Sequence, residues 1–247
     1  MKWRVIGMET MDAYRAMAYD EACVESVQAG GPPTIRFWTW RPSAVSIGYF
    51  QSLEDEVNVT ACREQGVNIV RRRTGGGAVY HDAKREFTYS VICPEEMVSK
   101  RITESYRIIC DWIRRGLWNL GIESSFHPIN DILAGGKKIS GNAQTRRGGV
   151  LHQHGTILYD LDLETMFTLL KVSDEKLSDK VIEAMEERVT SVKGFREVPL
   201  SGAYHAILQG FIHGKDWAFG KWLPSETEAA ERLALQRYAS RDWTYLR

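Results

Sequence analysis

The segment Arg71–Asp82, which reads Arg-Arg-Arg-Thr-Gly-Gly-Gly-Ala-Val-Tyr-His-Asp, constrains this chain more than any other. Three consecutive glycines uncover backbone N–H groups and permit positive φ, so the loop can lie directly against a ligand. The arginines before them carry forked donors that suit carboxylate or phosphate groups. A lone Gly-Gly-Gly run is typical of a tight turn. Here the Arg run and the His-Asp pair that flank it predict a site for a small anionic molecule.

Composition and charge exclude several classes of protein. The 247 residues are 43% hydrophobic and carry 32 Lys+Arg against 32 Asp+Glu, so the formal net charge is zero. Nucleic-acid-binding chains usually have a strong basic excess, so we expect no nucleic-acid partner. No apolar run reaches the length of a membrane span, and the N-terminus lacks the apolar core of a signal peptide. We therefore expect a cytoplasmic protein with no membrane partner.

The cysteines predict neither a disulfide framework nor a metal site. Cys23, Cys62, Cys93 and Cys110 are widely scattered, and none belongs to a Cys-x-x-Cys pair. Reduced thiols are the rule in the cytoplasm. Cys93 and Cys110 fall in an apolar strand and an amphipathic helix, so we expect both to be buried packing residues.

Hydrophobic periodicity predicts a strand-rich N-terminal two-thirds and a helical last third. Strands are expected over residues 34–40, 44–48, 67–70, 86–93 and 150–158, with two short strands within 132–140. Helices are expected over residues 13–28, 104–120, 163–170, 173–187, 203–213 and 225–239. This order is no regular β-α-β alternation, so mixed or antiparallel sheets backed by helices fit better than a doubly wound parallel sheet. We expect one domain over residues 1–247.

Two further segments carry chemistry, one from Asn130 to Gln144 and one from Gln153 to Leu158. Strand alternation puts Lys137 and Lys138 on opposite faces, so one can point into a pocket while the other faces water. A buried lysine is costly unless an anion compensates it. The alternative is a solvent-exposed hairpin with a Gly-Gly turn. The small residues that follow would allow either close approach of a ligand or close packing of the sheet.

Together the three segments resemble the lipoate–protein ligase A family of the biotin/lipoyl ligase superfamily. The resemblance rests on Arg-Arg-x-Thr-Gly-Gly-Gly-x-Val-x-His-Asp, on Asn-Asp followed by Gly-x-Lys and Gly-x-Ala, and on His-Gly-Thr before an apolar strand. Weaker matches lie at residues 17–22, 46–51 and 238–243. The resemblance implies an α/β fold of the α+β type, with a large mixed sheet, a small sheet and surrounding helices.

The resemblance also implies a two-step reaction. The carboxylate of lipoate, or of octanoate, attacks the α-phosphate of ATP with Mg²⁺, and gives the acyl-adenylate and pyrophosphate. A lysine amine on a carrier domain then attacks the mixed anhydride. The implied carriers are the acyltransferase subunits of 2-oxoacid dehydrogenases or the glycine-cleavage carrier protein.

The family's site lysine falls on Lys138, where the ammonium would stabilise negative charge in both transition states. Arg72 would orient the carboxylate or adenylate, His81 would shape the pocket by hydrogen bonding, and Asp131 would hold Mg²⁺ or a phosphate-bound lysine. Tyr49 and Val79 would line the acyl tunnel, although ordinary core residues are an equal alternative for them. The remaining expected binding residues are Gly48, Thr74, Gly75, Gly76, Gly77, Ala78, Gly141, Ala143, His154 and Gly155.

Two features in which this chain differs from related enzymes bear on its activity. Many full-length ligases carry a small C-terminal domain that supports adenylation, and we expect none within residues 1–247, so a separate accessory subunit is a candidate partner. The sister group of octanoyl transferases uses no ATP and requires a cysteine nucleophile. This chain has no cysteine after Cys110, which favours an ATP-dependent ligase over the alternative, an ATP-independent octanoyl or lipoyl transferase. A non-catalytic lipoate-binding relative is a third possibility.

Overall fold

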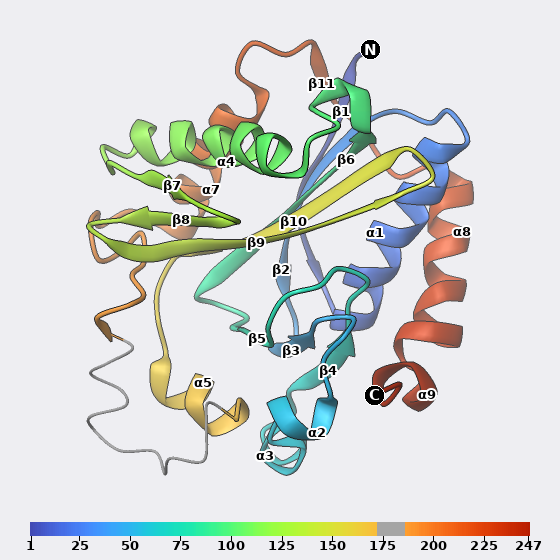
Figure 1. Cartoon of the computed structure of the whole chain (residues 1–247), viewed down its shortest axis with the longest axis vertical. Helices are drawn as coiled ribbons and strands as arrows, with labels where there is room; N and C mark the ends of the chain where they lie inside the picture. Colours follow the sequence, from blue (N-terminus) through green and yellow to red (C-terminus); the bar gives the residue numbers. More distant parts are fainter. Residues whose placement is uncertain (172–185) are drawn as a thin grey trace.

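A computed structural model describes residues 1–171 and 186–247 and is built around an eight-stranded mixed sheet (Figure 1). The strand order is β11-β1-β2-β6-β10-β9-β8-β7, with β1 parallel to β2 and β11 and the other pairs antiparallel. The strands are β1 (Trp3–Met11), β2 (Thr34–Trp40), β6 (Glu86–Pro94), β7 (Ser125–His127), β8 (Asp131–Ala134), β9 (Lys137–Arg147), β10 (Val150–Leu158) and β11 (Trp217–Phe219).

Helices cover both faces of this sheet (Figure 1). The helices α4 (Ile102–Asn119) and α7 (Leu200–Ile212) pack on one face, and α1 (Ala13–Gln28) and α8 (Pro224–Leu233) on the other. Alternation along β2 produces the two cores, because Ile35 and Phe37 join the α4–α7 side while Trp38 and Trp40 join the α1 side.

A three-stranded sheet lies beside the large one and carries the glycine-rich loop. Its order is β4-β3-β5, from β3 (Ala44–Ile47), β4 (Asn68–Arg71) and β5 (Val79–His81). The loop therefore joins β4 to β5. The short helices α2 (Leu53–Glu56), α3 (Val59–Glu64) and α5 (Leu163–Leu169) contribute to a separate small core under this sheet.

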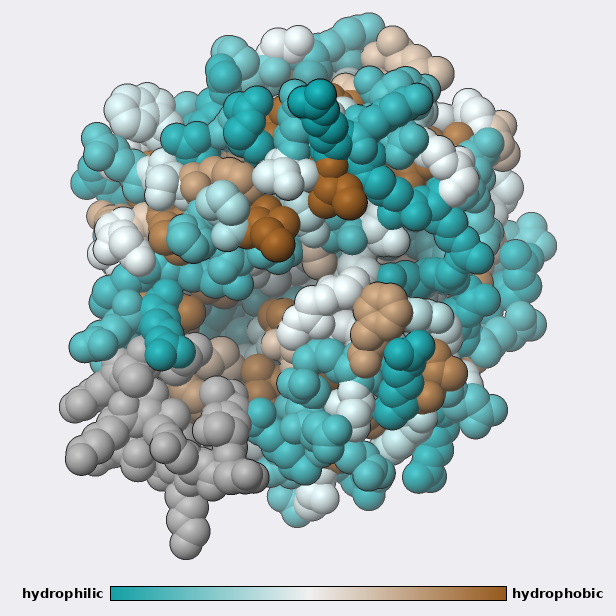
Figure 2. Space-filling model, viewed as in Figure 1, coloured by the Kyte–Doolittle hydropathy of each residue, from teal (hydrophilic) through white to brown (hydrophobic). Residues whose placement is uncertain are grey.

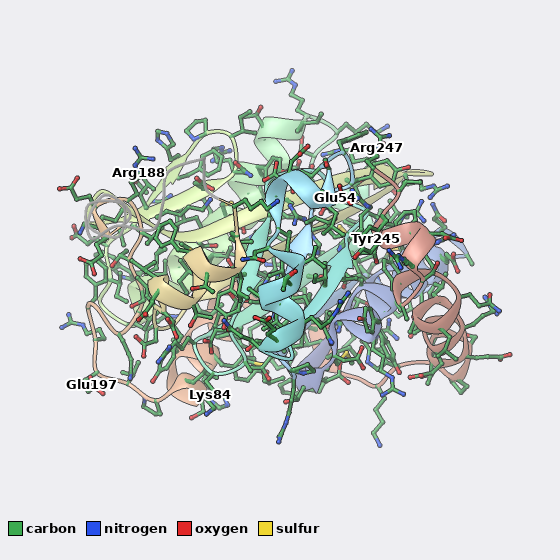
Figure 3. The ribbon with its side chains drawn as sticks, turned by 90° about the horizontal axis from the view of Figure 1, so that it is seen from below. Glu54, Lys84, Arg188, Glu197, Tyr245 and Arg247 are labelled. Atoms are coloured by element: carbon green, nitrogen blue, oxygen red, sulfur yellow. The ribbon has the colours of Figure 1, made fainter. Side chains whose placement is uncertain are left out.

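The C-terminal segment returns to the small sheet. The remaining elements are η1 (Glu95–Met97), η2 (Ala234–Tyr238) and α9 (Arg241–Thr244). Seen from below, Tyr245 and Arg247 lie near Glu54 of α2 (Figure 3), and the Arg247 carbonyl accepts a hydrogen bond from the Leu53 N–H at 3.1 Å. The last residues of the chain are thus close to the loop that follows β4.

The expected fold class is confirmed, and so are most of the expected elements. The helix over 13–28 and the strands over 34–40 and 150–158 have the predicted bounds. The strand after the Gly-Gly turn is longer than expected, because β9 continues to Arg147. Strands β1, β5, β7 and β11 were not expected from the sequence. The helix expected over 173–187 lies largely outside the described residues. No helix in the described part of the chain is long and apolar enough to cross a membrane.

Candidate functional site

The glycine-rich loop is held from within by Arg72. Its Nε donates to Thr74 Oγ1 at 3.2 Å, its Nη1 donates to the Ser46 carbonyl oxygen at 3.0 Å, and its Nη2 donates to the carbonyl oxygens of Gly75 and Gly77 at 2.9 and 2.7 Å. The side chain is buried, and burial lowers the pKa of the guanidinium to about 10. Arg72 thus fixes the shape of the loop, and its donors are directed into the protein rather than toward a carboxylate or adenylate.

Two glycines are required where this loop approaches β3. Gly76 has φ of 99°, and a Cβ built on it would lie 3.0 Å from Arg72 Nη2. A Cβ on Gly48 would lie 2.0 Å from the Gly76 carbonyl oxygen. Side chains are excluded at both positions, by backbone conformation at Gly76 and by space at Gly48.

Arg71 ties the C-terminal segment to the same loop. Its Nη1 donates to the Gln51 carbonyl oxygen at 2.6 Å, and its Nη2 donates to the Thr244 carbonyl oxygen at 2.9 Å. In return, the indole N–H of Trp243 donates to the Arg71 carbonyl oxygen at 2.8 Å. The end of the chain is therefore part of the framework that positions the loop.

A buried hydrogen-bond network joins the loop to the large sheet and to α1. Thr74 Oγ1 lies 2.7 Å from His154 Nε2, and His154 Nδ1 lies 3.3 Å from Asp20 Oδ2. The same Asp20 oxygen lies 3.1 Å from His152 Nε2, while Arg36 donates to its partner oxygen at 2.9 Å. These contacts bring together four segments that are distant in the sequence.

Burial and charge set the protonation of this network. Burial alone would raise the pKa of Asp20, but His152 and Arg36 hold it well below its usual range. Burial lowers the pKa of His154 to about 4, against the opposing effect of its hydrogen bond to Asp20. At neutral pH, Asp20 is therefore ionised and His154 is uncharged.

Lys138 lies on the same face of the large sheet as this network. His154 pairs with Ala143 and Thr156 pairs with Gly141, and directly paired residues share a face. A Cβ built on Gly141 would lie 2.7 Å from Cε and 2.9 Å from Nζ of Lys138, so the lysine side chain runs across Gly141. Its ammonium forms an ion pair with Asp131 Oδ1 at 2.7 Å.

The two lysines of the hairpin have different environments, as strand alternation predicted. Lys137 Nζ donates to the Glu186 carbonyl oxygen at 2.7 Å. The Lys138 side chain is 39% exposed and the Asp131 side chain is 27% exposed, although the paired atom Asp131 Oδ1 is itself buried. A ligand that displaces Asp131 could reach the Lys138 ammonium.

A cavity of about 780 Å³ opens between α1, the glycine-rich loop and the β9–β10 hairpin. Figure 2 shows a cleft across this side of the molecule, between the part that carries the large sheet and the part that carries the small sheet. The lining combines apolar and charged side chains. The lining residues are Met17, Asp20, Glu21, Val24, Glu25, Gln28, Tyr49, Phe50, Arg73, Gly75, Gln144, Thr145, Arg146, Arg147, Val150, His152, His154, Arg237 and Tyr238.

Among the expected binding residues, Tyr49, Gly75 and His154 line this cavity directly. His81 lies elsewhere, buried between Ser46 and Glu86, with its Nδ1 2.7 Å from Glu86 Oε1. Gly155 packs against β9, because a Cβ there would lie 2.2 Å from Asn142 Oδ1. Thr74, Gly76, Gly77, Gly48 and Ala143 support the loop or the sheet beneath it, while Ala78 and Val79 belong to the small-sheet region.

The lining residues of α1 and of the C-terminal segment include Met17, Asp20, Glu21 and Tyr238, which lie in weaker family matches but were not predicted as site residues. Glu21 receives short ion pairs from Arg73 and Arg237, and Tyr238 donates to its other oxygen at 2.7 Å. One signal was available, since Met17 and Glu21 lie on one face of a predicted helix at i, i+4 spacing. Charged residues on an otherwise buried helix face require partners, and here the partners come from distant segments.

Among the described residues, the one cluster with metal-ligand chemistry is Asp20, His152 and His154. Both oxygens of Asp20 already accept hydrogen bonds, from Arg36 and from Ser90 at 2.9 Å. The buried Arg36 guanidinium also compensates the carboxylate charge. The cluster therefore serves as a hydrogen-bond network. Asp131 faces an ammonium rather than other carboxylates, so it does not form the expected Mg²⁺ site.

Comparison with known proteins assigns this fold and site to a family. The family model for the lipoyl protein ligase A/B catalytic domain matches residues 12–212. The chain belongs to this family. The solved structures that resemble it include a bipartite lipoate protein ligase from Thermoplasma acidophilum, determined together with its E2 lipoyl domain. That ligase is 31% identical, has a TM-score of 0.90, and the match covers 100% of this chain and 98% of the ligase.

Another similar structure is a lipoate-protein ligase A bound with ATP, 30% identical with a TM-score of 0.87 over 99% of each chain. Relatives found by sequence similarity are named as octanoyltransferases and not as ligases. Octanoyltransferase LipM of Brevibacillus brevis is 33% identical, over 100% of this chain and 99% of the relative. Octanoyltransferase LipM of Kyrpidia tusciae is 35% identical, over 98% of each chain.

The similarity to octanoyltransferases corrects the expected activity. An ATP-dependent ligase was expected because the chain has no cysteine near the site, and that expectation is wrong. The expectations of ATP, of Mg²⁺ and of an adenylate intermediate are therefore wrong as well. The motifs that identify the family are common to both activities and therefore could not separate them.

Proposed function

We propose that this family member is an octanoyltransferase, which moves an octanoyl group from a thioester on a donor carrier protein to a lysine of a lipoyl carrier domain, without ATP. The observation that carries the proposal is full-length similarity to octanoyltransferases at 33–35% identity. The acceptors are those expected from the sequence, an acyltransferase subunit of a 2-oxoacid dehydrogenase or the glycine-cleavage carrier protein. Residues 1–247 act as one catalytic domain, and no accessory subunit for adenylation is required.

The cavity suits an acyl chain. Met17, Val24 and Val150 give its lining apolar side chains, and its volume of about 780 Å³ lies within the usual range for small-molecule sites. The polar groups of Asp20, His152 and His154 lie at one wall and are bonded to one another. Because these groups are already paired, an apolar chain can lie against them without leaving a polar atom unsatisfied.

Lys138 supplies the positive charge that acyl transfer requires. Attack of an amine on a thioester carbonyl places negative charge on the carbonyl oxygen in the transition state. An ammonium beside that oxygen stabilises the charge, and the effect is strong where water is excluded. The backbone N–H groups of Gly75–Gly77 are further candidate donors. Asp131 holds Lys138 extended across Gly141 until the substrate displaces it.

Intact mass spectrometry of a lipoyl domain tests this proposal. The purified chain is incubated with octanoyl-loaded carrier protein and the lipoyl domain, with no nucleotide present. The proposal predicts that the domain gains one octanoyl group, and that a domain whose target lysine is replaced by arginine gains none. Modification that requires free octanoate together with ATP, and that does not occur from the loaded carrier, would overturn it.

A further inference from the structure

Two arginines from distant parts of the chain meet on one carboxylate at the cavity wall. Arg73 belongs to the glycine-rich loop and Arg237 to η2, and Nη1 of each donates to Oε1 of Glu21. The other oxygen of Glu21 accepts from the Tyr238 hydroxyl at 2.7 Å. All four residues line the cavity. Each guanidinium carries one positive charge, so the pair brings one more charge than Glu21 neutralises.

Both guanidinium groups have unused hydrogen-bond donors. A guanidinium carries five N–H donors, and among the described residues the Arg73 and Arg237 side chains donate to Glu21 alone. These two side chains are 24% and 36% exposed, whereas the Glu21 side chain is 8% exposed. Their guanidinium carbons lie over the Trp243 ring, 6.0 and 5.4 Å from its centroid. Contact with the ring restricts both groups and leaves their N–H edges available.

The other charged side chains of the lining leave this positive charge in place. Two of them are neutralised by partners outside the lining, through the ion pairs Asp20–Arg36 and Arg146–Glu95. The remaining two, Glu25 and Arg147, are exposed and have opposite charges. Apart from its histidines, the lining therefore has an excess of one positive charge, which comes from Arg73 and Arg237 together with Glu21.

The glycine-rich loop adds a backbone donor near these side chains. Gly75 comes two residues after Arg73 and lines the same cavity. Within the described part of the chain, the N–H of Gly75 donates to no other group. Guanidinium groups and free backbone N–H groups are the donors with which proteins hold phosphate and carboxylate groups. This part of the wall thus has the chemistry of an anion-binding site.

We propose that Arg73 and Arg237 form an anion subsite, which holds the phosphate on the arm of the acyl donor. This inference rests on the proposed octanoyl transfer, in which the acyl group arrives as a thioester. Acyl thioesters are carried on pantetheine arms that bear a phosphate, both in carrier proteins and in coenzyme A. The phosphate accepts from the free N–H edges of both guanidinium groups, and Glu21 holds those groups side by side.

Binding of two fragments of the arm tests the subsite without acyl transfer. 4′-Phosphopantetheine and pantetheine differ by the phosphate alone, and NMR titration of the whole chain gives both dissociation constants. The subsite predicts that phosphopantetheine binds at least about 10-fold more tightly, as expected for charge-assisted hydrogen bonds. Arg73→Gln and Arg237→Gln should each lower this ratio below about 3. Each variant leaves Glu21 one guanidinium and the Tyr238 hydroxyl as partners.

Arg241→Gln is the matched control for these variants. Arg241 lies in α9 with its guanidinium over the Tyr245 ring, outside the cavity lining, so the ratio should stay within about 2-fold of that of the unmodified chain. A ratio of about 1 in the unmodified chain would overturn the subsite. Equal weakening of both fragments in the Arg73 and Arg237 variants would also overturn it, because the two arginines would then only support the fold.

Initial rates identify the donor and separate this inference from the proposed function. Octanoyl-loaded carrier protein and octanoyl-coenzyme A are compared as donors to a lipoyl domain. We expect the lower KM for the loaded carrier, and Arg237→Gln should raise that KM about 10-fold. A lower KM for octanoyl-coenzyme A would contradict the carrier protein as donor and leave the subsite intact. No transfer from either donor, with the fragment ratio preserved, would contradict the proposed function and not the anion subsite.

Discussion

At the scale of single residues, Lys138 is the group whose removal should cost most activity. Lys138→Ala removes the charge beside the developing oxyanion, and loss of one such group typically slows the chemical step about 100- to 1,000-fold. Initial rates of octanoyl transfer to a lipoyl domain measure the effect. Lys137→Ala is the matched control, because that side chain donates to the Glu186 carbonyl oxygen and not to Asp131, and its rate should change by less than about 3-fold. Equal rates for the two variants would remove Lys138 from the mechanism.

His154 gives a prediction for stability against pH. Its pKa is about 4 in the folded chain, below the ordinary value of 6.5, so the folded state holds the imidazole uncharged. The part of the unfolding free energy that depends on an uncharged His154 is complete above pH 6.5. It is lost as the pH falls toward 4, because the imidazole takes up a proton more readily in the unfolded chain than in the folded one. Between pH 7 and pH 5 this amounts to on the order of 2 kcal/mol of unfolding free energy.

Urea unfolding of the original chain and of His154→Asn at both pH values tests this. The variant should be less stable at pH 7, and its stability should fall less between pH 7 and pH 5. His213→Asn, at an exposed position, should leave the pH dependence of the original chain unchanged. An equal fall in the original chain and in His154→Asn would mean that His154 is not the group responsible.

The residues of the site were only partly predictable, for a physical reason. Motif residues such as Gly76, Lys138 and His154 are close in sequence to other motif residues, so they stand out. Asp20 lies in a weaker match, and its role could not be predicted, because its partner His152 is 132 positions away and only the fold reveals the contact. Arg72 was expected to orient a carboxylate or adenylate, but the direction of its donors depends on carbonyl groups that no sequence pattern displays.

At the scale of elements, the shape of the glycine-rich loop depends more on Gly76 than on the neighbouring Gly77. Gly76→Ala forces a side chain into φ of 99° and against Arg72 Nη2, and should destabilise the fold by about 1–3 kcal/mol. Octanoyl transfer should fall with it, because the loop is displaced. Thermal and urea unfolding, together with transfer rates, measure both effects.

Gly77→Ala is the control for that substitution. A Cβ on Gly77 meets no atom within 4 Å, and its φ is not positive. We therefore expect stability within about 0.5 kcal/mol of the unmodified chain, as for most exposed substitutions. If Gly77→Ala lost as much stability as Gly76→Ala, the cost would come from the general flexibility of the loop and not from the contact with Arg72.

Long elements were predictable and short or polar ones were not. Helix α1 was predicted with its bounds, since Asp12 caps its start and a Gly-Gly pair follows its end. Strand β1 was missed because it carries Arg4, whose burial depends on Glu226 at the other end of the chain. The strands β5, β7 and β11 have three residues each, too few to display a period of two.

At the scale of the whole molecule, family and activity have different origins in the sequence. The loop, the Lys138 strand and the His154 strand carry the resemblance to the family, and the family model matches residues 12–212. They do not report how the acyl group is activated. The lack of a cysteine at the site suggested ATP, whereas full-length similarity indicates octanoyl transfer.

The proposed octanoyl transfer is tested most directly by labelling the two possible sources of the acyl group. One reaction contains octanoyl-loaded carrier protein with natural isotopes, deuterated free octanoate, ATP, Mg²⁺, the chain and a lipoyl domain, and the acceptor is weighed by mass spectrometry. Octanoyl transfer predicts that the domain gains only the unlabelled octanoyl group, at a rate that does not change when ATP is removed. A domain that gains the deuterated group, and only while ATP is present, would contradict the account.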